Sequence, residues 1–437
     1  MKVLIVHGLR ADSRLTNLQH ATAFARHSFG ADVTYVNCFG FITDEVLETT
    51  FEAAVVTYEV LAQRNTPFWP ALEKRLRRIL KNCRTRILMP QDDYSSCGVL
   101  DDFVCASDAQ FVYSPITKDL EVLYPGAVSK GVKFFEALTG YWEAQTTLPF
   151  TKFRRPFRDR SIDVGQRVRH LPPQLGAEAS RKGYLAVTFA ERSRNMDFQV
   201  DVSTRDEDVL VGDDWWRFLG NTRFTIGRLG GASIGDPKGK LARQVYRMRI
   251  RRPDISENKM LEKLKWRSAK SGNFTAISPR LFEAAAMGVC QILENDHYFD
   301  GFEAWKHYIP LSNDLSNIDE VFHVMRDFAR CEEIVRESEA FLIQSDRFTY
   351  KSFVASLLHE AVGFQVDESL APTVRDIDDE VMSQDNSPWT SPSRQHPFLK
   401  SNRRATDKWV AAYEHEELMP ESFFIPWISA REALSRS

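Results

Sequence analysis

The first 150 residues alternate short apolar runs with stretches of helical periodicity. Residues 3–6 are apolar on both faces, as expected of a strand buried inside a parallel sheet. Residues 14–28 place apolar or small side chains at a spacing of three to four, which predicts a helix. Further strands are expected at 33–36, 53–58, 86–89 and 109–113. Strands and helices that alternate in this order predict a parallel sheet covered by helices on both faces.

The alternation breaks at a basic stretch around 149–161 and then resumes. Strands are expected at 162–168, 198–202, 224–226, 289–293 and 308–311. Helices are expected at 178–196, 214–219, 317–344, 349–363 and from residue 279, and a charged, mostly helical insertion at 239–267. Two consecutive patterns of this kind predict an α/β protein with two Rossmann-like, doubly wound domains facing across a cleft.

The predicted boundaries follow these changes of pattern. The domains are an N-terminal one at 1–150, a linker at 151–161, a second domain at 162–345, a C-terminal helix at 346–364 and a tail at 365–437. The basic linker is interpreted as a solvated connector, with an anionic membrane surface or a phosphate as the alternative ligand. The tail is rich in Ser, Pro, Gln and Asn at 383–397, which predicts a largely irregular segment. Its aromatic residues between 400 and 430 are expected to dock on the protein or on a partner.

Composition narrows the class of protein. The chain is 43% hydrophobic and 27% charged with a formal net charge of −3, which gives no global basic field for nucleic acid. Six scattered cysteines without a CxxC pair favour free thiols in a reducing compartment over disulfides or a zinc site. No apolar run reaches the roughly 18 residues of a membrane span, and the N-terminal run is too short for a signal peptide. A cytoplasmic location is therefore expected.

The segment 277–288, ISPRLFEAAAMG, is the most informative candidate site. Ser278 suits an N-cap and Pro279 the first helical position, so the backbone N–H groups at this helix start are expected to bind a diphosphate. Arg280 is expected to contact phosphate oxygens, and Glu283, one turn further, to contact ribose hydroxyls. An ordinary helix with an exposed Arg and Glu is the alternative interpretation.

The glycine-rich segment 227–239 follows a predicted strand, at the sheet edge where ligands bind in α/β folds. Gly230, Gly231 and Ser233 are expected to approach the donor with their backbone, although a plain tight turn is the alternative. The segment is not a P-loop, because the spacing is one residue short and a leucine follows Lys240. Lys240 is a further candidate for the diphosphate.

The N-terminal domain offers candidates for the acceptor side. Asp92 and Asp93 follow a predicted strand, and either is a candidate general base, with a turn as the alternative. His7 ends the first strand and is another candidate base, or a buried structural histidine. Arg14, at a predicted helix start, is a candidate for phosphate or acceptor, or a surface cap.

The segments ISPRLFEAAAMGVCQIL, HYIPLSNDLSNIDEV, STRDEDVLVGDDWWRFL and GGASIGDPKG, with PQDDY and LTGYW, resemble bacterial group 1 glycosyltransferases of GT-B fold. Within these the chain is most similar to glycosyltransferase-like spore proteins, over residues 1–363. The resemblance implies a nucleotide-diphospho-sugar donor, of UDP or GDP type, on the C-terminal domain and an acceptor mainly on the N-terminal one. Glu283 matches the acid of the E-A-x-A-x-G helix, and Arg280 matches the residue near the donor phosphates. Two positions depart from the pattern: Thr275 and Leu229 stand where related enzymes often carry acids.

The predicted function is metal-independent transfer of a sugar to an acceptor, whether polysaccharide, lipid, protein or small metabolite, with no cofactor besides the donor. GT-B enzymes generally stabilise the leaving diphosphate with basic side chains and helix dipoles. Three alternatives stay open. They are a metal-dependent transferase using residues 213–214 or 101–102, a nucleotide-sugar epimerase, and an inactive GT-B scaffold that binds glycans or proteins. The leucine at 229 favours the last.

Overall fold

The computed structural model describes residues 1–9, 13, 15–66, 68–367, 369 and 381 of the chain. They form two compact units. Unit 1 comprises Met1–Ala137, Ile234–Phe274 and the chain from Phe353, and unit 2 comprises Leu138–Ser233 and Thr275–Ser352. The units are interleaved along the chain, whereas the sequence pattern predicted consecutive domains. The reason is that the insertion and the last helix pack with unit 1 although they come after unit 2 begins.

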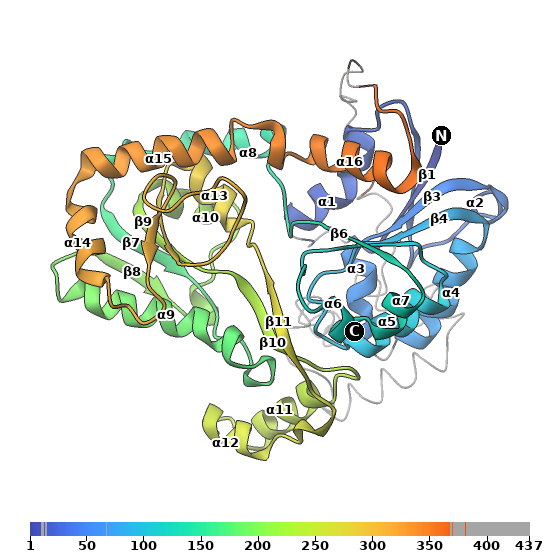
Figure 1. The fold of residues 1–437 in the computed structure, drawn as a ribbon, viewed down its shortest axis with the longest axis horizontal. Helices are drawn as coiled ribbons and strands as arrows, with labels where there is room; N and C mark the ends of the chain where they lie inside the picture. The colour runs from blue at the N-terminus through green and yellow to red at the C-terminus, as the bar shows by residue number, and fades with distance from the viewer. Residues whose placement is uncertain (10–12, 14, 67, 368, 370–380, 382–437) are drawn as a thin grey trace, which may run out of the picture. The chain divides into compact units, whose positions relative to one another are not determined.

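Unit 1 is built on a six-stranded parallel sheet (Figure 1). Its strand order is β2 (Asp32–Asn37), β1 (Lys2–His7), β3 (Phe51–Val56), β4 (Cys83–Leu88), β5 (Phe111–Ser114) and β6 (Lys133–Glu136). The five predicted strands are confirmed. The unpredicted β6 is an edge strand with polar ends, so it lacks the buried apolar run that marks the others. Its helices are α1 (Leu15–Arg26), α2 (Asp44–Glu48), α3 (Tyr58–Leu61), α4 (Trp69–Ile79), α5 (Cys97–Ala106), α6 (Leu120–Leu123), α7 (Pro125–Ser129) and, from Phe353, most of α16 (Tyr350–Val362).

Unit 2 holds a five-stranded parallel sheet, so the prediction of two Rossmann-like α/β bodies is confirmed. The strand order is β13 (Ile309–Leu311), β12 (Cys290–Glu294), β9 (Thr222–Gly227), β7 (Ile162–Arg167) and β8 (Val200–Ser203). Its helices are α8 (Ala144–Thr147), α9 (Ala177–Arg194), α10 (Asp213–Gly220), α13 (Arg280–Ala286), α14 (Ile318–Arg326) and α15 (Phe328–Leu342). The single helix predicted at 317–344 is two helices, because the Asp327 side chain accepts the Arg330 N–H and starts a new one.

The strand order of each sheet reverses direction beside its first strand. In unit 2, β7 lies between β8 and β9, so the connections that leave β7 and β8 run to opposite sides. The corresponding position in unit 1 is β1, between β2 and β3. Ligands of open parallel sheets bind outside the carboxyl ends of the strands at such a reversal. A ligand of unit 2 is therefore expected at the carboxyl ends of β7 and β9.

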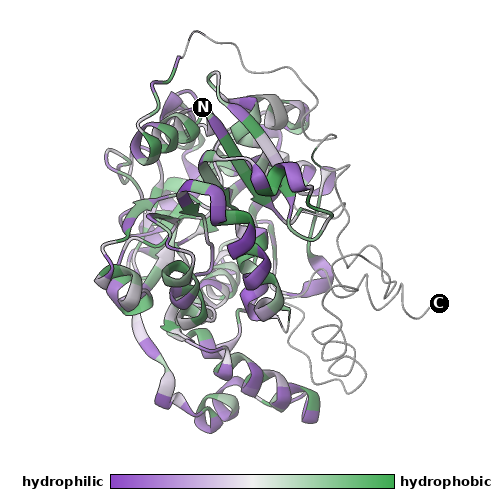
Figure 2. Cartoon of the chain, turned by 90° about the vertical axis from the view of Figure 1, so that its right-hand side faces the viewer, coloured by the Kyte–Doolittle hydropathy of each residue, from purple (hydrophilic) through white to green (hydrophobic). Residues whose placement is uncertain are grey.

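Residues 230–235 of the glycine-rich segment form a strand and not a plain tight turn. β10 (Gly230–Gly235) pairs with β11 (Lys270–Ala276), and this two-stranded sheet connects unit 2 with the insertion. The insertion carries α11 (Lys240–Arg251) and α12 (Glu257–Lys263), which confirms that it is mostly helical. Purple, hydrophilic residues are frequent along these two helices at the bottom of Figure 2.

Two further expectations concern the whole chain. All six cysteines are unpaired, as their scattered spacing predicts. No helix in the described ranges is both long and apolar enough to cross a membrane. Of the tail, Val381 is described and packs against Leu9 and Ala21 of unit 1. The aromatic segment at 400–430 lies outside the described residues.

Candidate functional site

A small cavity of about 40 Å³ lies at the carboxyl end of the unit 2 sheet. Its walls come from the ends of β7, β9 and β12 and from α9, α10 and α13, and it therefore coincides with the strand-order reversal. Its polar and aromatic lining residues are Gln166, Lys182, Trp215, Thr225, Arg228, Ser278, Arg280, Gln291 and Tyr298. Two predicted donor residues, Ser278 and Arg280, thus lie at the predicted edge of the sheet.

The ammonium group of Lys182 is the central feature of this cavity. Lys182 is half-buried on α9, and no hydrogen bond or ion pair joins it to another described residue. Burial, together with the positive charges of Arg280 and Arg228, lowers the pKa of Lys182 to about 7. The cavity therefore holds the charges of Lys182, Arg280 and Arg228, and the charge of Lys182 has no partner among the described residues. Such a group of positive charges favours the binding of an anion. Sequence analysis missed Lys182, because a lysine on a helix carries no local signal of its surroundings.

Arg280, Trp215 and Glu283 form a connected group beside the cavity. The Arg280 guanidinium lies 5.2 Å from the centre of the Trp215 ring and donates to the backbone oxygen of Arg167, at the end of β7. The Trp215 indole N–H donates to Glu283 Oε2 at 2.9 Å. Burial raises the pKa of the Glu283 carboxyl, while Arg280 and Trp215 act in the opposite direction. Glu283 is therefore half-buried and held by a neighbour, in contrast to an exposed surface acid.

The start of the 279–287 helix differs from the predicted cap. Helix α13 begins at Arg280, and its N-cap is Pro279, which has helical φ and ψ. The Ser278 side chain makes no capping bond; its backbone oxygen accepts the Leu281 N–H instead. A proline directly before the helix continues the turn by its φ angle, so the serine hydroxyl is not used as a cap. Any phosphate site here depends on the side chains of Lys182 and Arg280 more than on the helix start.

Arg228 anchors the opposite wall of the cavity through a buried ion network. Its Nε lies 2.7 Å from Glu294, and both side chains are 4% exposed. Its other nitrogens donate to the carboxylate and the backbone oxygen of Glu178, at the start of α9. Arg181, also on α9, pairs with Glu294 at 2.7 Å. The network therefore holds α9, which carries Lys182, against the ends of β9 and β12.

The residues predicted in the glycine-rich segment are divided between the two units. Gly230 borders the cavity, since a β-carbon built on it would lie 3.9 Å from Lys182 Nζ. Gly231 and Ser233 are half-buried in β10, and the φ of +132° at Gly231 is one that side chains rarely adopt. Lys240 belongs to unit 1, where it begins α11, so it is not part of the cavity of unit 2.

Leu229, at the position of an expected acid, is 6% exposed and packs in an apolar cluster of unit 2. The cluster includes Ile277, Leu281 and Phe282. A carboxylate could not replace it without burying a charge among apolar groups. The leucine is therefore part of the core beneath α13. No acid takes its place among the residues that line the cavity.

Of the candidate bases in unit 1, Asp92 presents its carboxylate at the surface. Asp92 is exposed, has a φ of +51° and accepts hydrogen bonds from the hydroxyls of Tyr94 and Tyr58. Asp93 is fully buried and accepts bonds from the hydroxyls of Ser114 and Tyr124. Burial raises the pKa of the Asp93 carboxyl. The interior position makes Asp93 a structural group of unit 1.

Of the remaining candidates in the N-terminal part, His7 is described by the structure. The His7 ring is fully buried, and its Nδ1 accepts the backbone N–H of Leu9 at 3.3 Å. This matches the alternative of a buried structural histidine. Arg14 lies outside the described residues.

Glu59, which sequence analysis missed, lies at the strand-order reversal of unit 1. It follows β3, and a β-carbon on Gly8, which follows β1, would lie 3.6 Å from its Cβ. The Thr57 hydroxyl donates to Glu59 Oε2 at 2.6 Å. Burial raises the pKa of Glu59 to about 7, against the effect of this bond. A half-buried carboxyl with a pKa near neutrality is the usual state of a general base.

The residues proposed for the metal-dependent alternative have structural roles or lie exposed. Asp101 accepts the backbone N–H groups of Gly126 and Ala127 at the start of α7. Asp213 begins α10 and pairs with Arg217 one turn on. Within the described ranges, no group of three or more His, Cys, Asp or Glu side chains is arranged to hold a metal ion.

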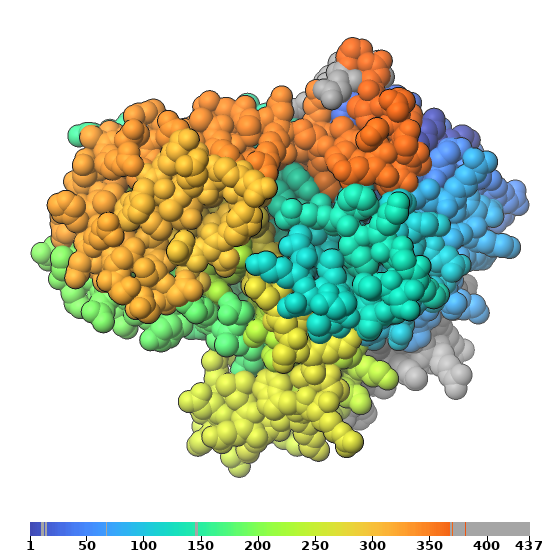
Figure 3. Space-filling view, viewed as in Figure 1, coloured from blue at the N-terminus to red at the C-terminus, as the bar shows by residue number. Residues whose placement is uncertain are grey.

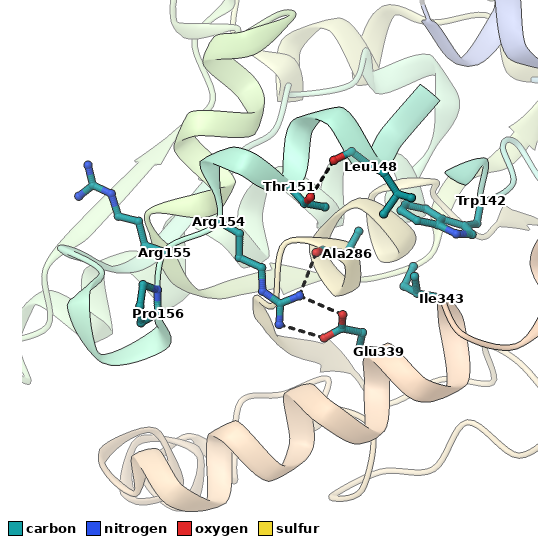
Figure 4. Close-up of a pocket in the computed structure, with 9 residues that line it drawn as sticks. All are labelled: Trp142, Leu148, Thr151, Arg154, Arg155, Pro156, Ala286, Glu339 and Ile343. Atoms are coloured by element: carbon teal, nitrogen blue, oxygen red, sulfur yellow. Dashed lines mark hydrogen bonds and ion pairs between the residues drawn. The ribbon is translucent and has the colours of Figure 1, made fainter. Parts of the chain in front are cut away.

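A larger pocket of about 520 Å³ lies elsewhere in unit 2, beside the predicted basic linker (Figure 4). Arg154 forms two bonds of 2.9 Å to the carboxylate of Glu339 and a third to the backbone oxygen of Ala286. Arg155 bonds to Asn221, and Arg158 to Glu332. These three arginines are exposed to solvent and also bond to neighbours within unit 2.

Gly288 lies beneath Arg154, which allows a test of this packing. A β-carbon on Gly288 would lie 2.6 Å from Arg154 Nε, and the φ of Gly288 is +62°. Gly288→Ala is expected to lower the free energy of unfolding by about 2 to 3 kcal/mol in a denaturation experiment. Gly131→Ala is the matched control, because Gly131 has a φ of +75° but open space around its β-carbon. Its expected cost is about 1 kcal/mol. Equal costs for the two variants would contradict the role of Gly288 beneath Arg154.

Comparison with known proteins gives only distant structural neighbours. No family model matches the chain, and no curated protein matches it. Among solved structures, Anabaena Alr3699/HepE in complex with UDP-glucose has 11% identity and a TM-score of 0.42, over 82% of this chain and 99% of that one. An alpha-glucosyltransferase in complex with UDP and a mismatched DNA has 8% identity and a TM-score of 0.45, over 83% and 99%. A putative UDP-N-acetylglucosamine 2-epimerase from Listeria monocytogenes has 11% identity and a TM-score of 0.37, over 84% of this chain and 98% of that one. At TM-scores below 0.5 these likenesses carry no weight for function, which is inferred from the residues of the chain.

Proposed function

We propose that the cavity of unit 2 binds the diphosphate of a nucleotide-sugar and that the chain is a glycosyltransferase. The observation that carries this proposal is the unneutralised ammonium group of Lys182 beside Arg280, at the strand-order reversal of a parallel sheet. An anion that enters the cavity gains two charge-assisted contacts and relieves the repulsion between these cations. The cavity has room for a phosphate-sized group, so the remainder of the donor lies outside it.

Transfer of a sugar requires stabilisation of the negative charge that develops on the departing diphosphate. Lys182 and Arg280 supply two positive charges in a partly desolvated site, where they act strongly on that charge. Lys182 also holds a proton with a pKa near 7 and is thus suited to donate a strong hydrogen bond to a phosphate oxygen. This arrangement supports metal-independent transfer, which remains part of the proposal.

Glu283 is assigned to the ribose or the sugar of the donor. One of its oxygens accepts the Trp215 indole N–H, which fixes the carboxylate close to Arg280 and leaves the other oxygen for a hydroxyl group. On the acceptor side we assign unit 1, where Asp92 and Glu59 are the carboxyls suited to remove a proton from a hydroxyl. Burial raises the pKa of Glu59 to about 7, which suits this carboxyl to the role of a base.

A thermal-shift screen with UDP, GDP, ADP and dTDP tests the proposal. One nucleotide is expected to stabilise the wild type clearly, by about 2.7 kcal/mol at a concentration of about 100 times Kd. Glu283→Ala is expected to weaken this binding roughly tenfold, because one hydrogen bond to a charged group is lost. Glu191→Ala, which removes an exposed acid of α9, is the matched control and should behave as the wild type. A flat response of the wild type to all four nucleotides would reject the donor site.

A binding scaffold without transferase activity is the second candidate, and Leu229 favours it. The residue lies in the core where an acid is expected, so the cavity lacks one carboxylate. If the nucleotide binds and neither transfer to acceptors nor donor hydrolysis follows, the scaffold is the better description. Consumption of a nucleotide-sugar without any acceptor would instead indicate an epimerase or a hydrolase.

A further inference from the structure

The insertion between β10 and β11 has a charge unlike that of the rest of the chain. Residues 238–267, named the basic insertion below, carry eleven lysines and arginines and three acids, whereas the whole chain has a formal net charge of −3. Nothing in the proposed donor site uses these residues, because the basic insertion belongs to unit 1 and the cavity to unit 2.

The basic insertion is a folded body with its own apolar interior. Leu241 and Val245 of α11 pack against Met260 of α12 and Leu264 after it, and all four are buried. Half-buried side chains such as Met248 and Trp266 surround this cluster. The apolar face of α11 is therefore already covered, and the outer faces of both helices are left to charged residues. In the view of Figure 3 the outer surface of these helices is open to solvent.

Ten of the eleven cations are exposed. They are Lys238, Lys240, Arg247, Arg249, Arg251, Arg252, Lys259, Lys263, Lys265 and Arg267. Within the part of the chain that the structure describes, none of these ten side chains forms an ion pair. Of the three acids of the insertion, Asp254 lies between the two helices, and Glu257 and Glu262 lie on α12. Every charged residue in the last two turns of α11 is therefore an arginine.

One apolar side chain stands out on this surface. Ile250 is 43% exposed and lies between Arg249 and Arg251 near the end of α11. An exposed apolar side chain on a cationic helix gains free energy at a lipid–water boundary, where the cations meet headgroups and the side chain enters the acyl region. The Ile250 side chain gains no such free energy from contact with the phosphate backbone of a nucleic acid.

The aromatic residues of the basic insertion also favour a lipid surface over a nucleic acid. Binding of single-stranded nucleic acid relies on exposed aromatic rings on which bases stack. Trp266 packs on the apolar cluster and its indole N–H donates to the backbone oxygen of Leu261. Tyr246 is half-buried. The surface therefore presents cations and one aliphatic side chain without an open stacking platform.

We propose that the basic insertion docks on the surface of an anionic lipid bilayer. Charge complementarity supplies the attraction, and Ile250 adds a shallow apolar contact. This inference is independent of the proposed transferase function, because it concerns a surface of unit 1 and its test measures no activity.

The test is co-sedimentation of the full chain with vesicles at about 0.1 M salt, where surface charges act over about 10 Å. Vesicles of phosphatidylcholine with roughly one-third phosphatidylglycerol are compared with vesicles of phosphatidylcholine alone. The wild type is expected to bind the anionic vesicles and not the neutral ones. The variant Arg247→Gln, Arg249→Gln, Arg251→Gln, Arg252→Gln keeps residues of good helix propensity and is expected to lower partitioning at least about 30-fold. Ile250→Ser should lower it several-fold.

The control variant removes four exposed cations elsewhere: Lys74→Gln, Arg78→Gln, Arg192→Gln and Arg194→Gln. It is expected to partition as the wild type, and thermal unfolding checks that each variant is folded. If the quadruple arginine variant fails to fold, two other results test the proposal. Ile250→Ser should lower partitioning several-fold, and binding of the wild type should fall steeply in higher salt. Absence of binding to anionic vesicles, or an equal loss of binding in the control variant, would overturn the proposal.

Discussion

Lys182→Met is expected to raise the melting temperature of the unliganded protein and to remove most of its nucleotide binding. The ammonium group is half-buried beside Arg280 and Arg228, so its charge opposes folding while no anion is present. Methionine keeps the length of the side chain and removes the charge. The affinity for the stabilising nucleotide should fall about 100-fold, as expected when a charged phosphate contact in a desolvated site is lost. Thermal unfolding with and without nucleotide measures both effects.

The lowered pKa of Lys182 predicts how stability and donor affinity change with pH. Its pKa is about 7 in the folded protein and 10.5 as the ordinary value, so the unfolded chain binds more protons between these pH values. The stability of the wild type relative to Lys182→Met therefore rises with pH from about 7 to 10.5, and the advantage of the variant is largest below pH 7. Donor affinity changes in the opposite direction. It should fall by up to about tenfold per pH unit above pH 7, because only the protonated amine binds the diphosphate.

Lys182→Arg is the matched control for this titration. A guanidinium keeps its charge over the whole range, so donor affinity should become independent of pH between 6 and 9. Binding is best measured with a nucleotide-sugar, because a doubly esterified diphosphate does not change its own charge in that range. An unchanged pH profile in Lys182→Arg would show that another group controls donor binding.

Arg228→Met is expected to cause the largest loss of stability, about 3 kcal/mol in the free energy of unfolding. Arg228 and Glu294 are each 4% exposed, and the variant leaves the carboxylate of Glu294 buried with Arg181 as its remaining partner. It also removes the bonds that hold the start of α9 through Glu178. Urea denaturation measures the change.

A second substitution separates charge burial from loss of packing. Glu294→Gln in the Arg228→Met background removes the uncompensated charge and should recover part of the stability. Arg205→Met, at an exposed ion pair with Asp208, is the surface control and should cost less than about 1 kcal/mol. A cost for Arg228→Met no larger than that of Arg205→Met would contradict the buried network.

The sequence was most informative about features that depend on residues close together in the chain. Buried strands such as β1 and β3 are nearly continuous apolar runs, and the segments between strands repeat every three to four residues, so the parallel α/β sheets were predictable. The segment that holds Arg280 and Glu283 was also predictable, because its proline and glycine mark a short helix between two sheet elements. The details of this segment were not predictable, because the serine cap is absent and the cavity depends on residues from other helices.

The sequence by itself determined the fold class and one wall of the candidate site, since both follow from spacing within about 15 residues. The tertiary structure decided the rest. Lys182 comes to lie near Arg280, and Trp215 beside Glu283, 68 residues away along the chain, because the strand order places α9, α10 and α13 at one edge of the sheet. The pairing of β10 with β11 and the interleaving of the two units depend in the same way on distant contacts. Such contacts form through burial and pairing of the whole chain, for which no local pattern exists.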